Sequence, residues 1–182
     1  MSETKSKKKY IGFFIGHSHK GLFKQEYLSN FYESPFVFTH NDVNYSFSSN
    51  EQFFMWSKAK VFKDEETELK IIGLAHNPKY AKKLGRQVKN YDDAKWIKKR
   101  DSIMYLGLYL KFTQNKKLKD YLLSTEDSIL VETSPYDKYW GCGLSANQDY
   151  RDESKWLGVN KLGTLLMQLR RELKNEEGVR SE

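Results

Sequence analysis

Apolar positions along the chain follow two periods, and the helical period prevails after about residue 50. Helical spacing and helix-capping residues predict helices over residues 48–62, 64–74, 77–86, 94–112, 116–124 and 160–173. Short segments rich in β-branched and aromatic residues predict strands over residues 10–15, 36–39, 43–47 and 128–133. The pattern therefore predicts a mainly α fold with a small β portion, of the α+β class.

Turn and capping residues mark the boundaries between these segments. Residues 40–42 separate two predicted strands and are typical of a hairpin turn. Asp64 and Asn115 are suited to cap the helices that follow them. The strand predicted over residues 128–133 joins either the hairpin or the strand at residues 10–15, and the pattern leaves both pairings open.

Residues 134–158 form the longest stretch without clear periodicity. A loop of roughly 25 residues is uncommon inside a compact domain and is more often functional than idle. A second irregular segment, residues 27–36, is rich in aromatic residues and lies next to a strand. Loops of this kind often form one side of a ligand-binding pocket.

The helix predicted over residues 48–62 carries two ionisable side chains on an otherwise apolar face. Phe54, Met55, Lys58 and Phe62 follow Glu51 at offsets that place all five on one side of a helix. Glu51 and Lys58 lie about 10 Å apart along the helix, too far for an ion pair between neighbouring turns. Each charge must therefore find another partner.

Two interpretations of these charges remain open. In the first, Ser48 and Glu51 form an S-x-x-E capping box and Lys58 extends out of the core. In the second, both charges point into a pocket bounded by the aromatic residues between positions 53 and 56. Burial in such a pocket would raise the pKa of a glutamate and lower the pKa of a lysine, which suits acid–base or amine chemistry.

The length of 182 residues is enough for one domain with a substantial core. We expect a disordered basic tail over residues 1–9, a domain over residues 10–174 and a frayed end over residues 175–182. No apolar run approaches the roughly 20 residues of a membrane span, and the lysine-rich start is unlike a signal peptide. We therefore expect a cytoplasmic protein without a membrane partner.

Composition narrows the possible ligands. The formal net charge of +7 favours anionic ligands such as phosphate esters or nucleic acid. Cys142 is the single cysteine, which excludes an internal disulfide and a cysteine cluster for metal. His17 and His19 share a glycine-bounded loop without a third ligand, so we expect no metal and no cofactor.

Two further polar groups have both a structural and a functional interpretation. Asp137 and Trp140 lie in a segment bounded by proline and glycine, where Asp137 either caps a turn or acts as an acid beside an aromatic platform. Arg86 follows a glycine at a predicted helix end, where it either binds phosphate or remains a surface charge. Lys82 and Lys83 nearby favour the phosphate site.

Eight collinear blocks give the chain a resemblance to a known family. They are LSNFY (28–32), SPF (34–36), SNEQFFMWSKA (49–59), LGR (84–86), IM (103–104), KFTQN (111–115), LVETSPYDKYWGCGL (130–144) and WLGVNKLGTLLM (156–167). In this order they resemble the YbiA-like, or NADAR, family over residues 11–171. The chain departs from the family at three places. It lacks the glycine usually found ahead of the Tyr45 strand, it has Thr125-Glu126-Asp127 where the family usually has T-G-D, and it has Cys142 at a position that is more often aliphatic.

The resemblance implies a single compact, mainly helical domain with N-glycosidase activity. Family members are described as cleaving the N-glycosidic bond of phosphorylated riboflavin-pathway intermediates, and related domains remove ADP-ribose from guanine in DNA. The implied partners are therefore a phosphorylated ribosyl or ADP-ribosyl small molecule and ADP-ribosylated DNA, and no oligomeric state is implied.

Matched position by position, the resemblance assigns catalytic roles to Glu51, Lys58 and Asp137. The implied substrate-binding residues are Asn30, Phe31, Arg86, Trp96, Trp140 and Asn160. In one mechanism Glu51 activates water beside the sugar C1, and Asp137 protonates the leaving nitrogen or anchors the ribose. In the other, a neutral Lys58 attacks C1 and forms a Schiff base with the opened sugar.

Two other functions fit parts of the sequence. The same pocket would serve a non-catalytic reader of ADP-ribose, although an acid and an amine beside the sugar favour an enzyme. A basic nucleic-acid-binding protein fits the net charge, but the positive residues are spread along the chain and no zinc-finger or RNA-recognition motif is present.

Overall fold

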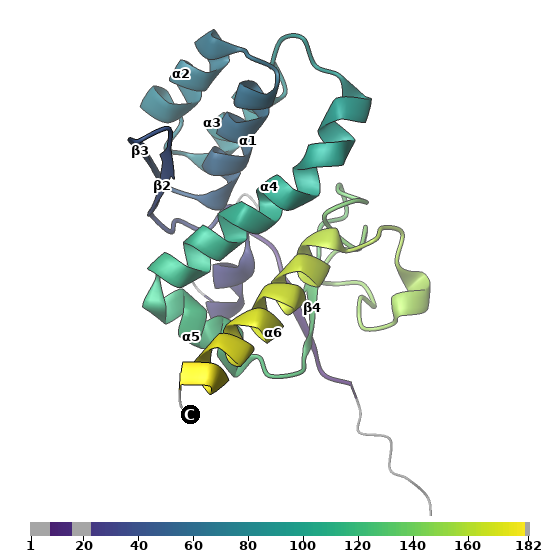
Figure 1. Cartoon of the computed structure of the whole chain (residues 1–182). Helices are drawn as coiled ribbons and strands as arrows, with labels where there is room; N and C mark the ends of the chain where they lie inside the picture. Colours follow the sequence, from purple (N-terminus) through teal and green to yellow (C-terminus); the bar gives the residue numbers. More distant parts are fainter. Residues whose placement is uncertain (1–7, 16–22, 181–182) are drawn as a thin grey trace, which may run out of the picture. The chain divides into compact units, whose positions relative to one another are not determined.

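The computed structural model describes residues 8–15 and 23–180 and is mainly helical (Figure 1). Its helices are α1 (Asn50–Val61), α2 (Glu65–Leu74), α3 (Pro78–Gly85), α4 (Asp93–Gln114), α5 (Lys116–Ser124) and α6 (Lys161–Arg180), with two 3-10 turns, η1 (Lys24–Leu28) and η2 (Glu153–Lys155). Its strands are β1 (Tyr10–Phe13), β2 (Phe36–His40), β3 (Val43–Phe47) and β4 (Ile129–Glu132). The predicted class, mainly α with a small β portion, is confirmed.

The chain divides into two compact units. The terminal unit combines the stretches 1–29 and 120–182, and the central unit consists of residues 30–119. The predicted domain limits at residues 10 and 174 stay predictions. Most of the predicted basic tail, together with His17 and His19, lies outside the described residues.

The central unit contains the predicted hairpin. β2 and β3 are antiparallel, with Phe36 opposite Phe47 and His40 opposite Val43. Asn41 and Asp42 connect them with φ angles of 49° and 59°. A two-residue type I′ turn needs this left-handed pair, and the short polar side chains of Asn and Asp tolerate it better than most others.

Helix α1 is the buried centre of the central unit. It packs against α2, α3 and α4 (Figure 1), and most of its residues are buried. The Phe47 ring of the hairpin lies 5.2 Å from the Phe53 ring and 5.3 Å from the Trp56 ring. The Phe54 ring lies 5.1 Å from Trp96 of α4. The helix is therefore apolar on more than the one predicted face, as expected for a helix enclosed by neighbours.

The terminal unit contains the second pair of strands. β1 and β4 are parallel, with Tyr10 opposite Ile129 and Phe13 opposite Glu132. The strand at 128–133 therefore pairs with the strand at 10–15 and not with the hairpin. A parallel pair needs a long connection, and here the whole central unit lies between the two strands in sequence. Helix α6 packs against β4.

Residues 134–158 are irregular apart from η2, as predicted. Backbone hydrogen bonds nevertheless order this loop at both ends. Cys142 N donates to Glu132 O, Leu157 N donates to Cys142 O, and Val159 N donates to Lys138 O, each at 2.9 Å. The Cys142 side chain lies in a buried cluster with Val131, Leu144 and Tyr150, so the thiol replaces an aliphatic group in packing.

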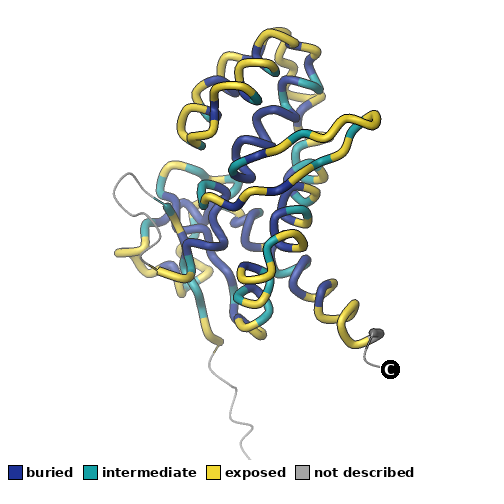
Figure 2. Tube along the Cα trace, turned by 90° about the vertical axis from the view of Figure 1, so that its left-hand side faces the viewer, coloured by how far each residue is buried: buried dark blue, intermediate teal, exposed yellow. Residues whose placement is uncertain are grey.

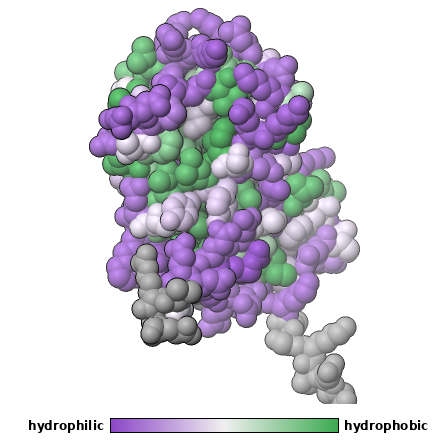
Figure 3. Space-filling view, in the orientation of Figure 1, coloured by the Kyte–Doolittle hydropathy of each residue, from purple (hydrophilic) through white to green (hydrophobic). Residues whose placement is uncertain are grey.

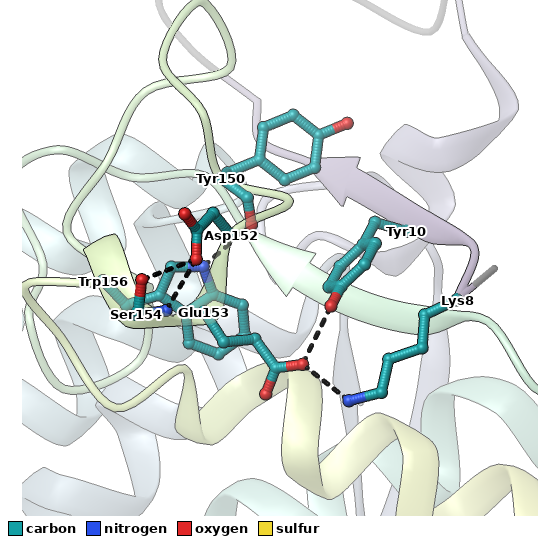
Figure 4. A network of polar contacts seen from close by, with 7 residues as sticks. All are labelled: Lys8, Tyr10, Tyr150, Asp152, Glu153, Ser154 and Trp156. Atoms are coloured by element: carbon teal, nitrogen blue, oxygen red, sulfur yellow. Dashed lines mark hydrogen bonds and ion pairs between the residues drawn. The ribbon is translucent and has the colours of Figure 1, made fainter. Parts of the chain in front are cut away.

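A polar network ties η2 to the first strand (Figure 4). Glu153 Oε1 accepts hydrogen bonds from Lys8 Nζ at 3.1 Å and from the Tyr10 hydroxyl at 2.9 Å. The Trp156 indole N–H donates to the Tyr150 carbonyl at 2.8 Å. Long irregular loops are ordered by contacts of this kind, since they lack the ladders of helices and sheets.

The turn that departs from the family pattern has a strained residue. Glu126 has a φ of 51°, a conformation that a glycine adopts without the cost that a Cβ brings. The buried Arg170 stabilises this turn, because its Nη1 donates to Thr125 Oγ1 at 2.7 Å and to Ser128 O at 3.0 Å. The glutamate is thus accommodated without loss of the turn.

The last helix is longer than predicted. The sequence predicts its end at Leu173, whereas α6 continues to Arg180. The extension contains the strong helix formers Lys174, Glu176 and Glu177. Just before it, the Gln168 amide donates to Glu172 one turn later. The end of α6 near the C-terminus is exposed (yellow in Figure 2).

The visible surface is largely hydrophilic, with smaller hydrophobic areas between the polar ones (Figure 3). This agrees with a chain in which 30% of the residues are charged. Within the described residues, none of the helices combines the length and hydrophobicity that crossing a lipid bilayer requires.

Candidate functional site

The N-terminus of α1 is capped one residue later than the sequence predicts. Ser49 is the N-cap, and its Oγ accepts from Gln52 N at 3.2 Å. The Gln52 side chain reaches back to the residue before the N-cap, since its Oε1 accepts from Ser48 N at 2.7 Å. The predicted Ser48–Glu51 box is therefore wrong, and Glu51 does not form it.

Tertiary contacts explain this choice between two overlapping patterns. The Gln52 amide nitrogen donates to the Ile71 carbonyl of α2 at 2.9 Å, which holds Gln52 in the capping position. The Ser48 hydroxyl donates to the His76 carbonyl at 2.7 Å. The side chains of Ser48, Ser49 and Gln52 thus form the hydrogen bonds around the start of α1. The Glu51 carboxylate takes part in none of these bonds.

Glu51 is buried, with 6% of its surface exposed, and its backbone is joined to the loop at Asn30. Glu51 N donates to Asn30 O at 3.0 Å. The Asn30 side chain accepts from Asn50 Nδ2 at 2.8 Å and donates to Met104 Sδ at 3.2 Å. A Cβ at Gly107 would lie 1.9 Å from Asn50 Oδ1, so α4 approaches this point closely only because it has a glycine there.

Lys58 is half-buried and its amine has defined neighbours. Nζ donates to the Gly85 carbonyl at 3.0 Å and lies 4.4 Å from the centre of the Tyr91 ring and 5.8 Å from that of Trp96. Burial lowers the pKa of Lys58, and the nearby charge of Glu51 acts in the opposite direction. Lys58 therefore does not simply extend into solvent, and it lies within the electrostatic field of Glu51.

Trp96 forms an aromatic wall next to this amine. Its indole is buried, with rings of Phe54 at 5.1 Å and Phe62 at 6.4 Å. Most of its surface is therefore used in packing, and the Lys58 amine lies over its ring at 5.8 Å. This arrangement suits a rigid wall beside the amine better than a fully exposed stacking platform.

The other predicted residues of the central unit lie at the end of α3. Arg86 is the exposed C-cap of that helix, directly after the glycine whose carbonyl binds Lys58. Lys82 Nζ lies 5.4 Å from the centre of the Phe31 ring. One end of α3 therefore combines the Lys58 contact with two basic side chains, which suits an anionic ligand.

Asp137, in the terminal unit, caps a turn, which is the structural one of its two interpretations. Its Oδ1 accepts from Tyr139 N at 3.0 Å and from Trp140 N at 2.8 Å. The rings of Tyr139 and Trp140 lie edge to face at 5.0 Å, and Asp137 and Trp140 are each partly exposed. Asp137 thus orients Trp140 through the backbone, whatever further role its carboxyl has.

Asn160 is a buried backbone clamp. Its Oδ1 accepts from Glu132 N at 3.0 Å, and its Nδ2 donates to Leu130 O at 2.9 Å. Its φ of 51° is the left-handed conformation that asparagine tolerates better than most residues. These contacts hold the start of α6 against β4, which is a structural role.

The central unit thus brings together Asn30, Phe31, Glu51, Lys58, Arg86 and Trp96, while Asp137, Trp140 and Asn160 belong to the terminal unit. Sequence reasoning missed Gly85 and Tyr91, which contact the Lys58 amine. Gly85 lies within the LGR block, which is the signal that points to it. Among residues 8–15 and 23–180, no group of three or more His, Cys, Asp or Glu side chains is placed to hold a metal ion.

Most of this chain can be matched to known proteins of similar sequence or structure. The NADAR domain model matches residues 13–174. N-glycosidase R617 of Acanthamoeba polyphaga mimivirus is 36% identical over 168 residues, which are 90% of this chain and 96% of that protein. The chloroplastic riboflavin biosynthesis protein PYRR of Zea mays is 37% identical over 106 residues, which are 56% of this chain and 15% of the maize protein. The NMR structure of the E. coli protein YbiA matches with a TM-score of 0.71 and 27% identity, over 94% of this chain and 89% of that chain, which confirms the predicted fold.

Proposed function

Since this chain belongs to the NADAR domain family, we propose that it is an N-glycosidase, which hydrolyses the bond between C1 of a ribose and a nitrogen of a base. The observation that carries the proposal is the position of Glu51. Its carboxylate is buried at the first turn of α1, while Ser49 and Gln52 cap the helix. A buried acid in the electrostatic field of a half-buried lysine with a lowered pKa is typical of a catalytic site.

The proposed substrate is a phosphorylated ribosylamine of a pyrimidine, of the kind that occurs early in riboflavin biosynthesis. The similarity to the maize riboflavin biosynthesis protein PYRR supports this choice. The net charge of +7 and the basic residues Lys82 and Arg86 at the end of α3 favour a phosphorylated sugar. ADP-ribosylated guanine in DNA is the second proposed substrate, because it also has a ribose C1 bonded to nitrogen and phosphate on the sugar.

In the first of two proposed routes, Glu51 acts as a general base. It accepts a proton from water, whose oxygen bonds to C1, while the C1–N bond breaks. The electron pair of that bond stays on the nitrogen, which takes up a proton from Glu51 or from Asp137. The negative charge of Glu51 also stabilises the positive charge that develops on the sugar. The role of Asp137 as proton donor or ribose anchor stays a prediction.

In the second route, Lys58 is the nucleophile. The neutral amine bonds to C1 as the C1–N bond breaks, and opening of the sugar ring gives an imine that water then hydrolyses. The lowered pKa of Lys58 supports this route, since only the neutral amine has an electron pair to donate. Glu51 would then move protons between the amine and water.

The direct test is a product assay with both substrates. The protein is incubated with the pyrimidine ribosylamine phosphate and with ADP-ribosylated guanine in DNA, and released ribose phosphate and ADP-ribose are quantified. We expect release from the first substrate. Tight binding without release from either would contradict the proposal and identify a non-catalytic reader.

Borohydride trapping distinguishes the two routes. Reduction during turnover would link the sugar to Lys58 if the imine forms, and peptide mass spectrometry locates the adduct. Lys58→Arg removes the reactive amine, and Lys60→Arg on the same helix is the matched control. An adduct in the control that is absent from Lys58→Arg supports the imine route, whereas no adduct in either the parent or the control leaves the Glu51 route.

A further inference from the structure

The Lys58 amine has a neighbour that belongs to none of the predicted site residues. Its Nζ lies 4.4 Å from the centre of the Tyr91 ring, closer than to the ring of Trp96 at 5.8 Å. A cation this close to an aromatic face is attracted by the electron density of the ring. Of these two rings, that of Tyr91 is therefore the nearer to the amine.

Tyr91 is itself held in place, although 44% of its surface is exposed. Its hydroxyl donates to Asp93 Oδ1 at 2.8 Å, and its ring lies 5.2 Å from the ring of Phe62. Burial and the bond to Asp93 both raise the pKa of Tyr91, so the phenol stays neutral and keeps donating near neutral pH. The Tyr91 ring is thus held by the hydrogen bond of its hydroxyl to Asp93 and by packing against Phe62.

The third part of the arrangement is the Gly85 carbonyl, which accepts from Lys58 Nζ at 3.0 Å. A Cβ at Gly85 would lie 2.0 Å from Met55 Sδ, so a larger residue would displace the Met55 side chain or move α3 away from α1. The glycine therefore brings a carbonyl within reach of the amine, and the Tyr91 ring provides a second contact.

We propose that Tyr91 is a positioning residue, whose tethered ring holds the Lys58 amine beside the Gly85 carbonyl. The proposal rests on the proposed function for the part that Lys58 plays in hydrolysis, but the arrangement at Tyr91 is independent of any substrate. Tyr91 would act through Lys58, by setting where the amine lies and how readily it loses its proton.

Several charges act on this arrangement. Glu51 opposes the lowering of the Lys58 pKa by burial. The charges of Asp93 and Asp92 raise the pKa of Tyr91, and the charge of Arg100 lowers it. The face of the ring favours the ammonium form of Lys58 over the neutral amine. Loss of the ring removes this attraction, which lowers the pKa of Lys58, and also removes part of its burial, which raises the pKa. Leucine keeps apolar cover next to the amine, so Tyr91→Leu should make Lys58 lose its proton, and react with acylating agents, at lower pH. Glutamine admits water, so Tyr91→Gln should give a smaller shift.

The test is the pH dependence of Lys58 acetylation by acetic anhydride, measured by peptide mass spectrometry on the intact folded chain. Tyr91→Leu and Tyr91→Gln both remove the ring, and Tyr91→Phe keeps it. Lys60 is the internal control, because it lies on the same helix with its Nζ 5.4 Å from the Trp56 ring, away from Tyr91. Circular dichroism checks that each variant has kept its fold.

We expect the Lys58 midpoint to fall by about half a unit to one pH unit in Tyr91→Leu, with smaller changes in Tyr91→Gln and Tyr91→Phe. The Lys60 midpoint should stay the same in all variants. An unchanged Lys58 midpoint in both ring-free variants would overturn the proposal, as would equal shifts with and without the ring. Because the assay uses no substrate, a failure of the proposed hydrolysis would leave this result unaffected.

Discussion

Glu51 in the central unit and Asn160 in the terminal unit are both buried polar residues, and the fold uses them differently. Both polar atoms of the Asn160 side chain bond to the backbone of β4. Next to Glu51, the side chains of Ser49 and Gln52 accept hydrogen bonds from backbone N–H groups at the start of α1. A buried polar side chain is thus a candidate for chemistry when neighbouring side chains already bond to the nearby backbone groups.

Asp137 lies between these two cases. One carboxylate oxygen caps a turn through two backbone N–H groups, and the side chain remains partly exposed. A structural and a functional role are therefore compatible in the same residue. Substitutions that keep the capping oxygen and remove the acid can separate the two roles.

The largest effect on stability is expected for Asn160→Gly. Glycine tolerates the φ of 51°, so the substitution removes the two side-chain hydrogen bonds without adding backbone strain. Leaving two buried backbone groups without partners should lower the free energy of unfolding by about 2–4 kcal/mol. Urea unfolding measures this, with exposed Asn147→Gly as the control. A loss below about 1 kcal/mol would contradict the clamp role.

A smaller loss is expected for Asp64→Ala, since Asp64 is a carboxylate of the central unit that the fold does use for capping. Its Oδ1 accepts from Thr67 N at 3.2 Å and its Oδ2 from Lys89 N at 2.8 Å. Losing this N-cap should lower the free energy of unfolding by about 1–2 kcal/mol near neutral pH. Exposed Glu65→Ala in the first turn of α2 is the control.

The Asp64 effect should depend on pH. Burial alone would raise the pKa of Asp64, but the hydrogen bonds from Lys89 and Thr67 outweigh burial and hold the pKa below its usual value. A lowered folded pKa means that the stabilisation is complete above the unfolded pKa and is lost as the pH falls through the folded pKa. The difference between Asp64 and Asp64→Ala should therefore shrink in acid, and a difference that grows there would contradict this account.

The smallest effect on stability is expected for Asp137→Asn. The asparagine Oδ1 can still accept from the amides of Tyr139 and Trp140, so the free energy of unfolding should change by less than about 0.5 kcal/mol. Asp137→Ala removes the cap and should cost about 1 kcal/mol. Equal losses in both variants, measured by urea unfolding, would show that the charge and not the capping oxygen stabilises this turn.

Local features of the fold could be predicted from the sequence. The hairpin follows from Asn41 and Asp42, and the start of α2 follows from Asp64, because turns and caps depend on residues a few positions apart. The length of α6 was underestimated, since its charged end lacks the apolar period that marks a buried helix face.

The features that define the site depend on distant residues. Residues 48–52 contain both S-x-x-E and S-x-x-Q, and the choice between them depends on the carbonyls of Ile71 and His76. The partners of Lys58, Gly85 and Tyr91, come from another helix and from the segment before α4. Periodicity does not contain such contacts, so the sequence alone left the roles of Glu51 and Lys58 open.

The most direct test of the account is a paired measurement on Glu51→Gln. Turnover of the pyrimidine ribosylamine phosphate by this variant should fall by about 10²–10⁴-fold, because the general base is lost. Substrate affinity and the free energy of unfolding should stay close to those of the parent, as in the control Glu65→Gln. Parental turnover together with a loss of about 1 kcal/mol of stability would contradict the account, since Glu51 would then be a helix cap after all.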